Sequence, residues 1–148
     1  MKIIDCFKGE YFFLSNFYES YTTINHIVYP TIEHFFQAQK AMNNEERNSI
    51  IEAGSPNIAK AIGRKVQLRP DWEEIKDQVM YDGVKAKFSK NPILKAKLLA
   101  TGDAELIEGN WWNDTYWGVC KGVGYNKLGK ILMRVRDELN KGNIIVKI

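Results

Sequence analysis

The sequence has few of the residues that cross-link a small domain or bind a metal ion. Its 148 residues include two cysteines, Cys6 and Cys120, and two histidines, His26 and His34. Two thiols far apart do not make a disulfide framework, which favours a reducing compartment. The histidines are not at i, i+4 spacing and have no cysteine nearby, so a zinc site would lack its usual ligands. We therefore expect no metal site, and a nucleophilic Cys–His pair has no positive support in the sequence.

The chain also lacks long apolar runs and a strong charge of either sign. No stretch approaches the about 18 consecutive apolar residues that indicate a transmembrane helix. Asp5, Lys8 and Glu10 interrupt the place where a signal peptide would have its apolar core. The net charge of +3 is too weak to indicate nucleic acid by itself, although it permits an anionic small substrate or a phosphate. We expect a cytoplasmic protein with no membrane contact.

The remaining composition is that of an ordinary globular domain. Hydrophobic residues make up 45% of the chain and charged residues 26%. The length predicts one domain over residues 1–148. Short strands are expected first, at Ile3–Phe7 and Tyr11–Leu14, then a hairpin of Tyr21–Ile24 and Ile27–Tyr29 that turns near residues 25–26.

Helices are expected over most of the rest. Cap residues, prolines, glycine stops and apolar spacing predict helices over Thr31 to about Met42, Asn44–Ala53, Pro56–Ile62, Asp71–Lys90, Ile93–Ala100 and Asn126–Gly142. Residues 109–125 look irregular, and Ile144–Ile148 is a candidate closing strand. The sequence predicts the α+β class: a single, mainly helical domain with a small sheet from the N-terminal strands, which the C-terminal strand can also join.

The segment from Glu108 to Gly129 concentrates residue types that serve ligand binding and catalysis. It holds three of the four tryptophans, four glycines and the carboxylates of Glu108 and Asp114. Rings offer stacking faces, glycine allows close backbone approach, and carboxylates perform acid–base chemistry. The alternative is a glycine-rich loop held over the core by its tryptophans, with Asp114 capping a turn.

Two further groups of residues could likewise serve either ligand binding or a purely structural role. Ser15-Asn16-Phe17 either reads the polar edge of a ligand and stacks on its ring, or is a turn that leaves a strand. Glu33, Gln37 and Lys40 share one helix face, which is either solvated or one wall of a polar pocket. Glu33 is in the first turn, where the helix dipole favours its ionised form.

Taken together, these stretches resemble the NADAR family, which is named for NAD and ADP-ribose. The resemblance is carried by FLSNF (residues 13–17), YPTIEHFFQAQK (29–40), the DWEEIKDQVM…AKF run (71–88), and E…DTYWG…GYNKLGKILMRVR (108–136). These motifs cover nearly the whole chain in the family's order. The five residues GNWWN between Glu108 and Asp114 depart from the family pattern, which affects pocket shape and substrate preference.

The resemblance implies an N-glycosidase that needs no cofactor. Its substrates would be phosphorylated N-ribosides of riboflavin synthesis or ADP-ribosylated guanine, including ADP-ribosylated nucleic acid. Each joins ribose C1 to an exocyclic amine, so cleavage should pass through an oxocarbenium-like state. The implied catalytic residues are Glu33 and Asp114, and the implied substrate-binding residues are Ser15, Asn16, Phe17, Lys40, Arg64, Glu108, Trp117 and Gly118. Which carboxylate is acid and which is base stays open, as does the oligomeric state.

Two other functional classes compete with this interpretation. A non-catalytic ADP-ribose or NAD binding module would bind ligand and release no product. A nucleic-acid interaction protein would bind unmodified DNA or RNA with an affinity that falls steeply with salt. The weak net charge argues against the second class.

Overall fold

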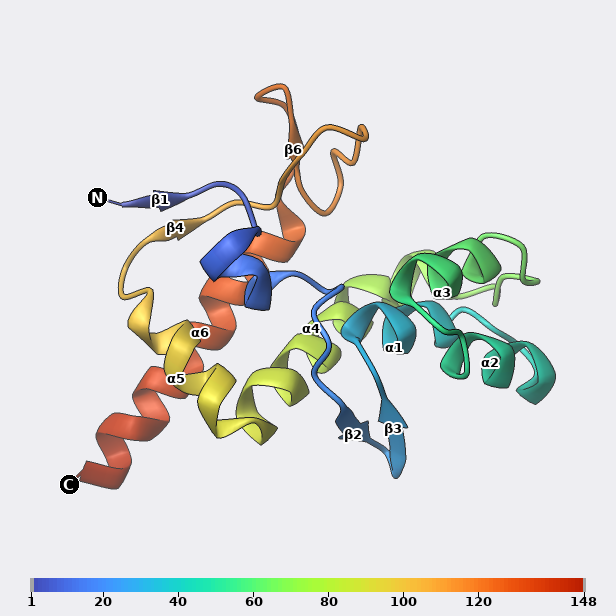
Figure 1. Cartoon of the computed structure of the whole chain (residues 1–148), viewed down its shortest axis with the longest axis horizontal. Helices are drawn as coiled ribbons and strands as arrows, with labels where there is room; N and C mark the ends of the chain where they lie inside the picture. Colours follow the sequence, from blue (N-terminus) through green and yellow to red (C-terminus); the bar gives the residue numbers. More distant parts are fainter. Residues whose placement is uncertain (1, 148) are drawn as a thin grey trace. The chain divides into compact units, whose positions relative to one another are not determined.

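The computed structural model describes residues 2–147, with side chains described up to residue 142. The chain divides into two compact units, which we call the central unit (residues 16–87) and the terminal unit (residues up to Ser15 and from Phe88 onward). The single-domain prediction stays a prediction. In chain order the elements are β1 (Ile3–Ile4), η1 (Gly9–Leu14, a 3-10 helix), β2 (Thr22–Ile24), β3 (Ile27–Tyr29), α1 (Ile32–Ala38), α2 (Asn44–Ile51), α3 (Pro56–Gly63), α4 (Trp72–Lys90), α5 (Pro92–Ala100), β4 (Glu105–Leu106), β5 (Gly109–Asn110), β6 (Val119–Cys120) and α6 (Lys127–Lys147) (Figure 1).

The central unit begins with the predicted hairpin, and its turn residues explain the tight reversal. Strands β2 and β3 pair antiparallel, and Asn25 and His26 both have positive φ, at 52° and 70°. Two consecutive left-handed residues form the kind of turn that matches the twist of a two-stranded ribbon. Tyr29 at the end of β3 packs edge to face on Phe35 of α1, with ring centroids 5.2 Å apart. The hairpin therefore leads directly into the first helix.

Helices α1, α2 and α3 pack on one another within the central unit (Figure 1). Each begins at a side-chain cap: Thr31 for α1, Asn43 for α2 and Ser55 for α3 accept backbone N–H groups of the first turn. Helix α1 ends at Ala38, earlier than the predicted Met42. The chain leaves the helix there because Ala41 forms a bridge with Leu68, which the helical pattern does not reveal.

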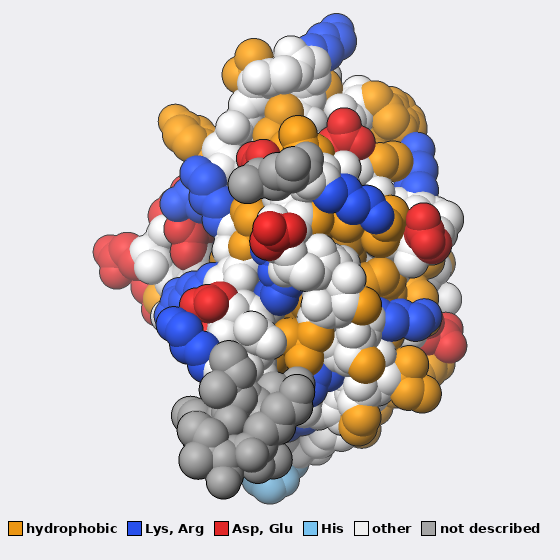
Figure 2. All heavy atoms as spheres, turned by 90° about the vertical axis from the view of Figure 1, so that its left-hand side faces the viewer, with side chains coloured by type: hydrophobic (Ala, Val, Ile, Leu, Met, Phe, Trp, Pro, Cys, Tyr) orange, Lys and Arg blue, Asp and Glu red, His pale blue; other side chains and the backbone are white. Residues whose placement is uncertain are grey.

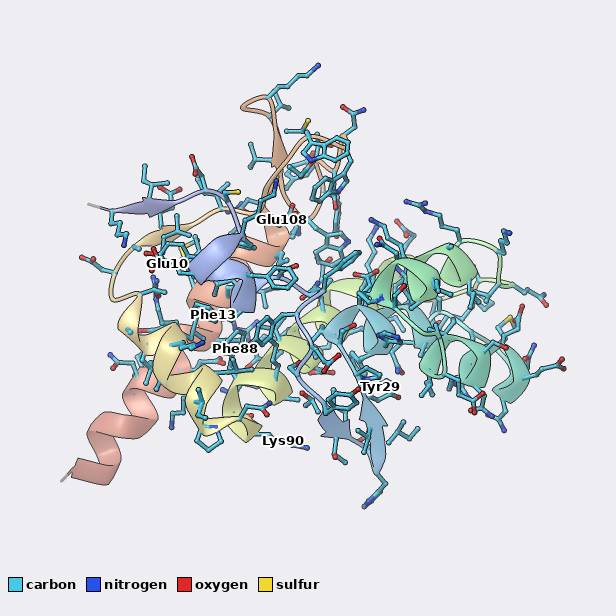
Figure 3. The ribbon with its side chains drawn as sticks, viewed as in Figure 1. Glu10, Phe13, Tyr29, Phe88, Lys90 and Glu108 are labelled. Carbon is cyan, nitrogen blue, oxygen red and sulfur yellow. The ribbon has the colours of Figure 1, made fainter. Side chains whose placement is uncertain are left out.

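The terminal unit joins the beginning of the chain to its second half. Strand β1 pairs parallel with β4, matching Ile3 with Glu105 and Ile4 with Leu106, and β5 pairs parallel with β6. Helices α5 and α6 pack together, and α6 buries the apolar side chains of Leu128, Leu132, Val135 and Leu139. Phe13 of η1 meets Phe88 edge to face, with ring centroids 6.4 Å apart (Figure 3).

Two predicted strands are wrong. Tyr11–Leu14 belongs to the 3-10 helix η1, which buries the adjacent side chains of Phe13 and Leu14. Ile144–Lys147 continues α6 instead of forming a strand, and Ile148 lies outside the described residues. Gly142 weakens a helix by about 1 kcal/mol relative to alanine without ending it.

The predicted α+β class, mainly helical with little sheet, is confirmed. In the part of the chain that the structure describes, the strands form three separate two-stranded pairs, where the sequence predicted one small sheet. Within residues 2–147, no helix has the length and apolar character needed to cross a bilayer.

Candidate active site

Helix α1 places Glu33, Gln37 and Lys40 in the central unit, in or next to one short helix. Glu33 is in the first turn and is 8% exposed, and its backbone N–H donates to the carbonyl oxygen of Asn16 at 3.1 Å. Its Oε2 accepts a hydrogen bond from Gln37 Nε2 at 2.6 Å. This face is therefore not solvated at Glu33 and Gln37, and its role as one wall of a polar pocket stays a prediction.

The environment of Glu33 acts on its protonation in two opposing directions. Burial raises the pKa of the Glu33 carboxyl, while the Gln37 hydrogen bond and the positive charges of Lys60 and Lys40 lower it. The net direction is upward, because desolvation of the charged form is the largest effect. The sequence predicted that the helix start keeps Glu33 ionised, and burial works against that. A buried carboxyl with a raised pKa is suited to holding or transferring a proton.

Two basic side chains, Lys40 and Lys60, act electrostatically on this carboxyl, and Arg64 acts on Lys40. We call Lys40, Lys60 and Arg64 the cationic cluster. Burial lowers the pKa of Lys40, the Glu33 carboxylate raises it, and the charges of Arg64 and Lys60 lower it further. The Lys40 ammonium also lies 5.8 Å from the ring centroids of both Phe36 and Trp72. Like charges held together beside one carboxylate make a place where a ligand anion would be favoured.

The FLSNF motif contributes its last two residues to the same unit. Asn16 is buried, and its side-chain Nδ2 lies 3.3 Å from the sulfur of Met80. Its backbone carbonyl oxygen accepts the backbone N–H of Glu33. The ring of half-buried Phe17 lies under the Lys60 ammonium, with 5.9 Å from Nζ to the ring centroid. Ser15 belongs to the terminal unit, where its backbone N–H closes η1 on Phe12.

The terminal unit places Glu108, Asp114, Trp117 and Gly118 in and next to the loop that joins β5 to β6. Asn110 links this loop, because its side-chain amide donates to Glu108 Oε2 at 3.0 Å and to the backbone oxygen of Asp114 at 2.8 Å. Asp114 Oδ1 accepts the backbone N–H groups of Tyr116 at 3.1 Å and Trp117 at 2.9 Å. Asp114 thus does cap a turn, and this leaves its catalytic assignment a prediction.

Gly118 has a structural reason to be glycine. A Cβ at this position would lie 1.8 Å from Glu108 Oε2 and 2.1 Å from the Glu108 backbone oxygen. The side chain of Asn126 fixes the same region, since its Oδ1 accepts the Glu108 N–H and its Nδ2 donates to Leu106, each at 3.0 Å. Glu108 is therefore held tightly, as a supporting residue would be.

The two tryptophans of the GNWWN departure are exposed. Trp111 is 76% exposed and Trp112 45% exposed, and their rings meet edge to face with centroids 5.6 Å apart. Neither tryptophan is buried, which excludes the alternative that these two rings hold the loop over the core. Trp117 is half-buried and packs edge to face on Tyr116 at 4.8 Å.

His34 has a structural role in the central unit. Its Nε2 lies 3.0 Å from the carbonyl oxygen of Ala53, and its Nδ1 lies 2.8 Å from Thr31 Oγ1. Nε2 thus links α1 to the segment after α2, and Nδ1 contacts the cap residue of α1.

The prediction of site residues missed Lys60 and gave Gln37 no role. Lys60 precedes Arg64 by four residues in and just after α3, and that spacing on one helix face could have revealed it. Gln37 had been placed on the Glu33 face, yet its contact with the carboxylate depends on how deeply both side chains are buried.

Comparisons with known proteins agree on one family. The NADAR domain matches residues 6–140. The chain is 41% identical over 135 residues to N-glycosidase YbiA of Escherichia coli (strain K12), which covers 89% of this chain and 84% of that protein. It is 39% identical over 132 residues to a riboflavin biosynthesis protein of Vibrio vulnificus (strain YJ016), covering 87% of this chain and 36% of that protein. The NMR structure of the E. coli protein YbiA superimposes with a TM-score of 0.87 and 38% identity, over 97% of this chain and 88% of that one.

Proposed function

Because the chain belongs to the NADAR domain family, we propose that it is an N-glycosidase that hydrolyses the bond between ribose C1 and an exocyclic amine in phosphorylated N-ribosides. Relatives named N-glycosidase, at about 40% identity over most of the chain, support the reaction class. The main structural support for the proposal is that the Glu33 carboxyl is buried and interacts with the lysine charges of the cationic cluster.

The reaction needs a carboxylate next to the ribose. Loss of the amine leaves positive charge on C1 and the ring oxygen, and a nearby anion stabilises that charge. In this proposal Glu33 faces the ribose and either stabilises the cation or activates the attacking water. Its raised pKa fits a group that takes up the water proton as the C–N bond breaks.

The cationic cluster would recognise the phosphate of the substrate. Lys40 interacts electrostatically with both Lys60 and Arg64, and the two lysines interact with Glu33, so these charges act on the same small region of the central unit. A phosphate there would relieve the repulsion among the three cations. Phe17, beside Lys60, and Asn16, beside Glu33, would contact the base.

Asp114 is proposed as the second carboxylate, assisting the leaving amine, with Trp117 stacking on the base and Ser15, Glu108 and Gly118 in supporting roles. This assignment rests on the family motif. Asp114 Oδ1 is engaged by two backbone N–H groups, so any proton transfer would fall to its other oxygen.

Two substrate classes remain candidates, ribosylamino-pyrimidine phosphates and ADP-ribosylated guanine. The Vibrio relative named as a riboflavin biosynthesis protein favours the first. Unmodified nucleic acid is disfavoured, since basic and acidic side chains are interspersed on the face shown in Figure 2 and the net charge is only +3. A cytoplasmic location stays a prediction.

The test is Glu33→Gln, assayed by release of ribose 5-phosphate from a ribosylamino-pyrimidine phosphate. Losing the acid–base group should lower kcat by about 10²–10⁴-fold. The matched control is Glu45→Gln, an exposed carboxylate in the first turn of α2. Parallel incubations with NAD and ADP-ribosylated guanine DNA, analysed by mass spectrometry, identify the preferred substrate. Tight ligand binding with no product from any of the three would instead establish a non-catalytic ADP-ribose or NAD binding module.

A further inference from the structure

Gln37 lies one helical turn after Glu33 and touches its carboxylate, yet the proposed reaction gives it no task. Its Nε2 donates to Glu33 Oε2 at 2.6 Å, and the Gln37 side chain is 3% exposed. Among the described residues, Glu33 Oε1 accepts no such hydrogen bond, so this oxygen is available to a ligand. The position of the Gln37 amide therefore determines how Glu33 is presented.

Gly63, the last residue of α3, limits where that amide can lie. A Cβ on Gly63 would stand 2.0 Å from Gln37 Oε1, 2.8 Å from its Cδ and 3.1 Å from its Cβ. Contacts of 2.0 and 2.8 Å are impossible between these atoms, so any side chain at residue 63 would push the Gln37 amide away. Helices α1 and α3 are in contact, and the amide is enclosed between them.

The two ends of the amide have different surroundings. Its oxygen is buried against Gly63 and accepts no hydrogen bond from the described residues, while its nitrogen donates to the carboxylate. Turning the amide over would place its oxygen against an ionised Glu33 oxygen, and two acceptors in contact repel. The Glu33 carboxylate therefore selects the orientation that supplies it with a donor, and the space left by Gly63 accommodates the amide in that orientation.

We propose that Gly63 is a positioning residue for Glu33: by leaving room for the Gln37 amide, it keeps an N–H donor on Glu33 Oε2 and presents Oε1 to the substrate. This inference rests on the proposed function, in which Glu33 faces the ribose. It extends that function to a residue of α3 that touches neither Glu33 nor the substrate.

The primary test is Gly63→Ala. Displacing the amide should lower kcat by about 10- to 100-fold with little change in KM, because a misdirected carboxylate harms the transition state more than binding. Because the Gln37 hydrogen bond lowers the pKa of Glu33, its loss should also move the Glu33-controlled limb of the pH–kcat profile to higher pH. A loss of activity through general packing damage would leave that limb in place.

The matched control is Gly83→Ala. A Cβ at Gly83 would press on the same helix, 2.8 Å from Phe35 Cδ2, without reaching Gln37. We expect it to lower stability and leave the pH limb unmoved. An equal shift of the limb in Gly83→Ala would overturn the proposal, since any disturbance of α1 would then suffice.

A second variant covers the case in which Gly63→Ala does not fold. Gln37→Leu keeps a similar volume, removes the donor and leaves Gly63 in place, so it should shift the limb in the same direction. In a Gln37→Ala background, adding Gly63→Ala should have almost no further effect on kcat, because the two shortest contacts are gone. Additive losses in that double variant would contradict a role through Gln37.

A titration that needs no activity separates this proposal from the proposed function. The 13C-carboxyl signal of Glu33, followed by NMR from pH 3 to pH 9, should titrate at higher pH in Gly63→Ala and Gln37→Leu than in the wild type. An unchanged titration overturns the positioning role. A shifted titration with no change in turnover confirms the positioning of Glu33 and refutes its place in the reaction.

Discussion

The backbone N–H of Glu33 donates to the carbonyl oxygen of Asn16 at 3.1 Å. This bond joins the FLSNF motif to the first turn of α1, where backbone N–H groups have no partner within the helix. It gives the turn that carries the buried carboxylate a fixed anchor outside its own helix. The motif residues around Asn16 thus contribute to the site through the main chain as well as through side chains.

The N-cap of α1 should contribute more to the free energy of unfolding than an ordinary helix cap does. Thr31 Oγ1 accepts the His34 N–H at 3.1 Å and lies 2.8 Å from His34 Nδ1, and both side chains are buried. Thr31→Ala should lower the free energy of unfolding by about 1–2 kcal/mol. The control is Ser55→Ala at the start of α3, which should cost less because that cap is exposed. Urea denaturation measures both, and an equal loss would contradict the linkage to His34.

Stability should rise with pH through the titration of Lys87. This side chain is 1% exposed, and burial lowers its pKa from 10.5 to about 7. Between those two values the unfolded chain holds the Lys87 proton and the folded chain does not, so raising the pH favours folding. The free energy of unfolding of the wild type should therefore increase from pH 7 towards pH 10.

Lys87→Met supplies the comparison for that slope. It removes the titrating group and keeps an apolar side chain of similar length, so the increase should be smaller than in the wild type. Denaturant unfolding at several pH values measures the difference. Parallel curves for the two proteins would show that Lys87 keeps its ordinary pKa in the fold.

The role of the cationic cluster is tested by comparing two neighbouring lysines. Lys60→Met should raise KM for a phosphorylated N-riboside by about 10- to 100-fold, since a hydrogen bond to a charged group contributes roughly 1.5–3 kcal/mol. Lys65→Met removes an exposed charge that does not act on Glu33 or Lys40. It should leave KM nearly unchanged. With a dephosphorylated substrate, Lys60→Met and Lys65→Met should have similar KM values. If Lys60→Met raised KM equally for both substrates, that would argue against phosphate recognition.

Asp114 has two possible tasks that a pair of substitutions separates. Asp114→Asn keeps an oxygen for the N–H groups of Tyr116 and Trp117 but removes the carboxylate, whereas Asp114→Ala removes both. If Asp114 assists the leaving amine, Asp114→Asn should lose about 10²–10⁴-fold in kcat at wild-type stability. Near-normal turnover in Asp114→Asn, with lower stability only in Asp114→Ala, would reduce Asp114 to a turn cap.

Much of the fold was predictable because its signals are local. Thr31 and Ser55 cap helices, Pro56 begins one, and Asn25-His26 forms the hairpin turn, and each depends on residues a few positions apart. The secondary-structure predictions failed where packing against segments distant in the sequence determines the local structure. The sequence at Tyr11–Leu14 favours a strand, yet it forms a 3-10 helix that buries two adjacent side chains.

The same division applies to the candidate site. The sequence by itself determined the family, the α+β class and the set of acidic, basic and aromatic residues that carry the proposed chemistry. Only the tertiary structure decided that Glu33 is buried, that Lys60 joins Lys40 beside it, and that Gly63 leaves space for Gln37. Desolvation, electrostatic interaction and steric exclusion depend on which helices pack together, and no local pattern along α1 or α3 records that packing.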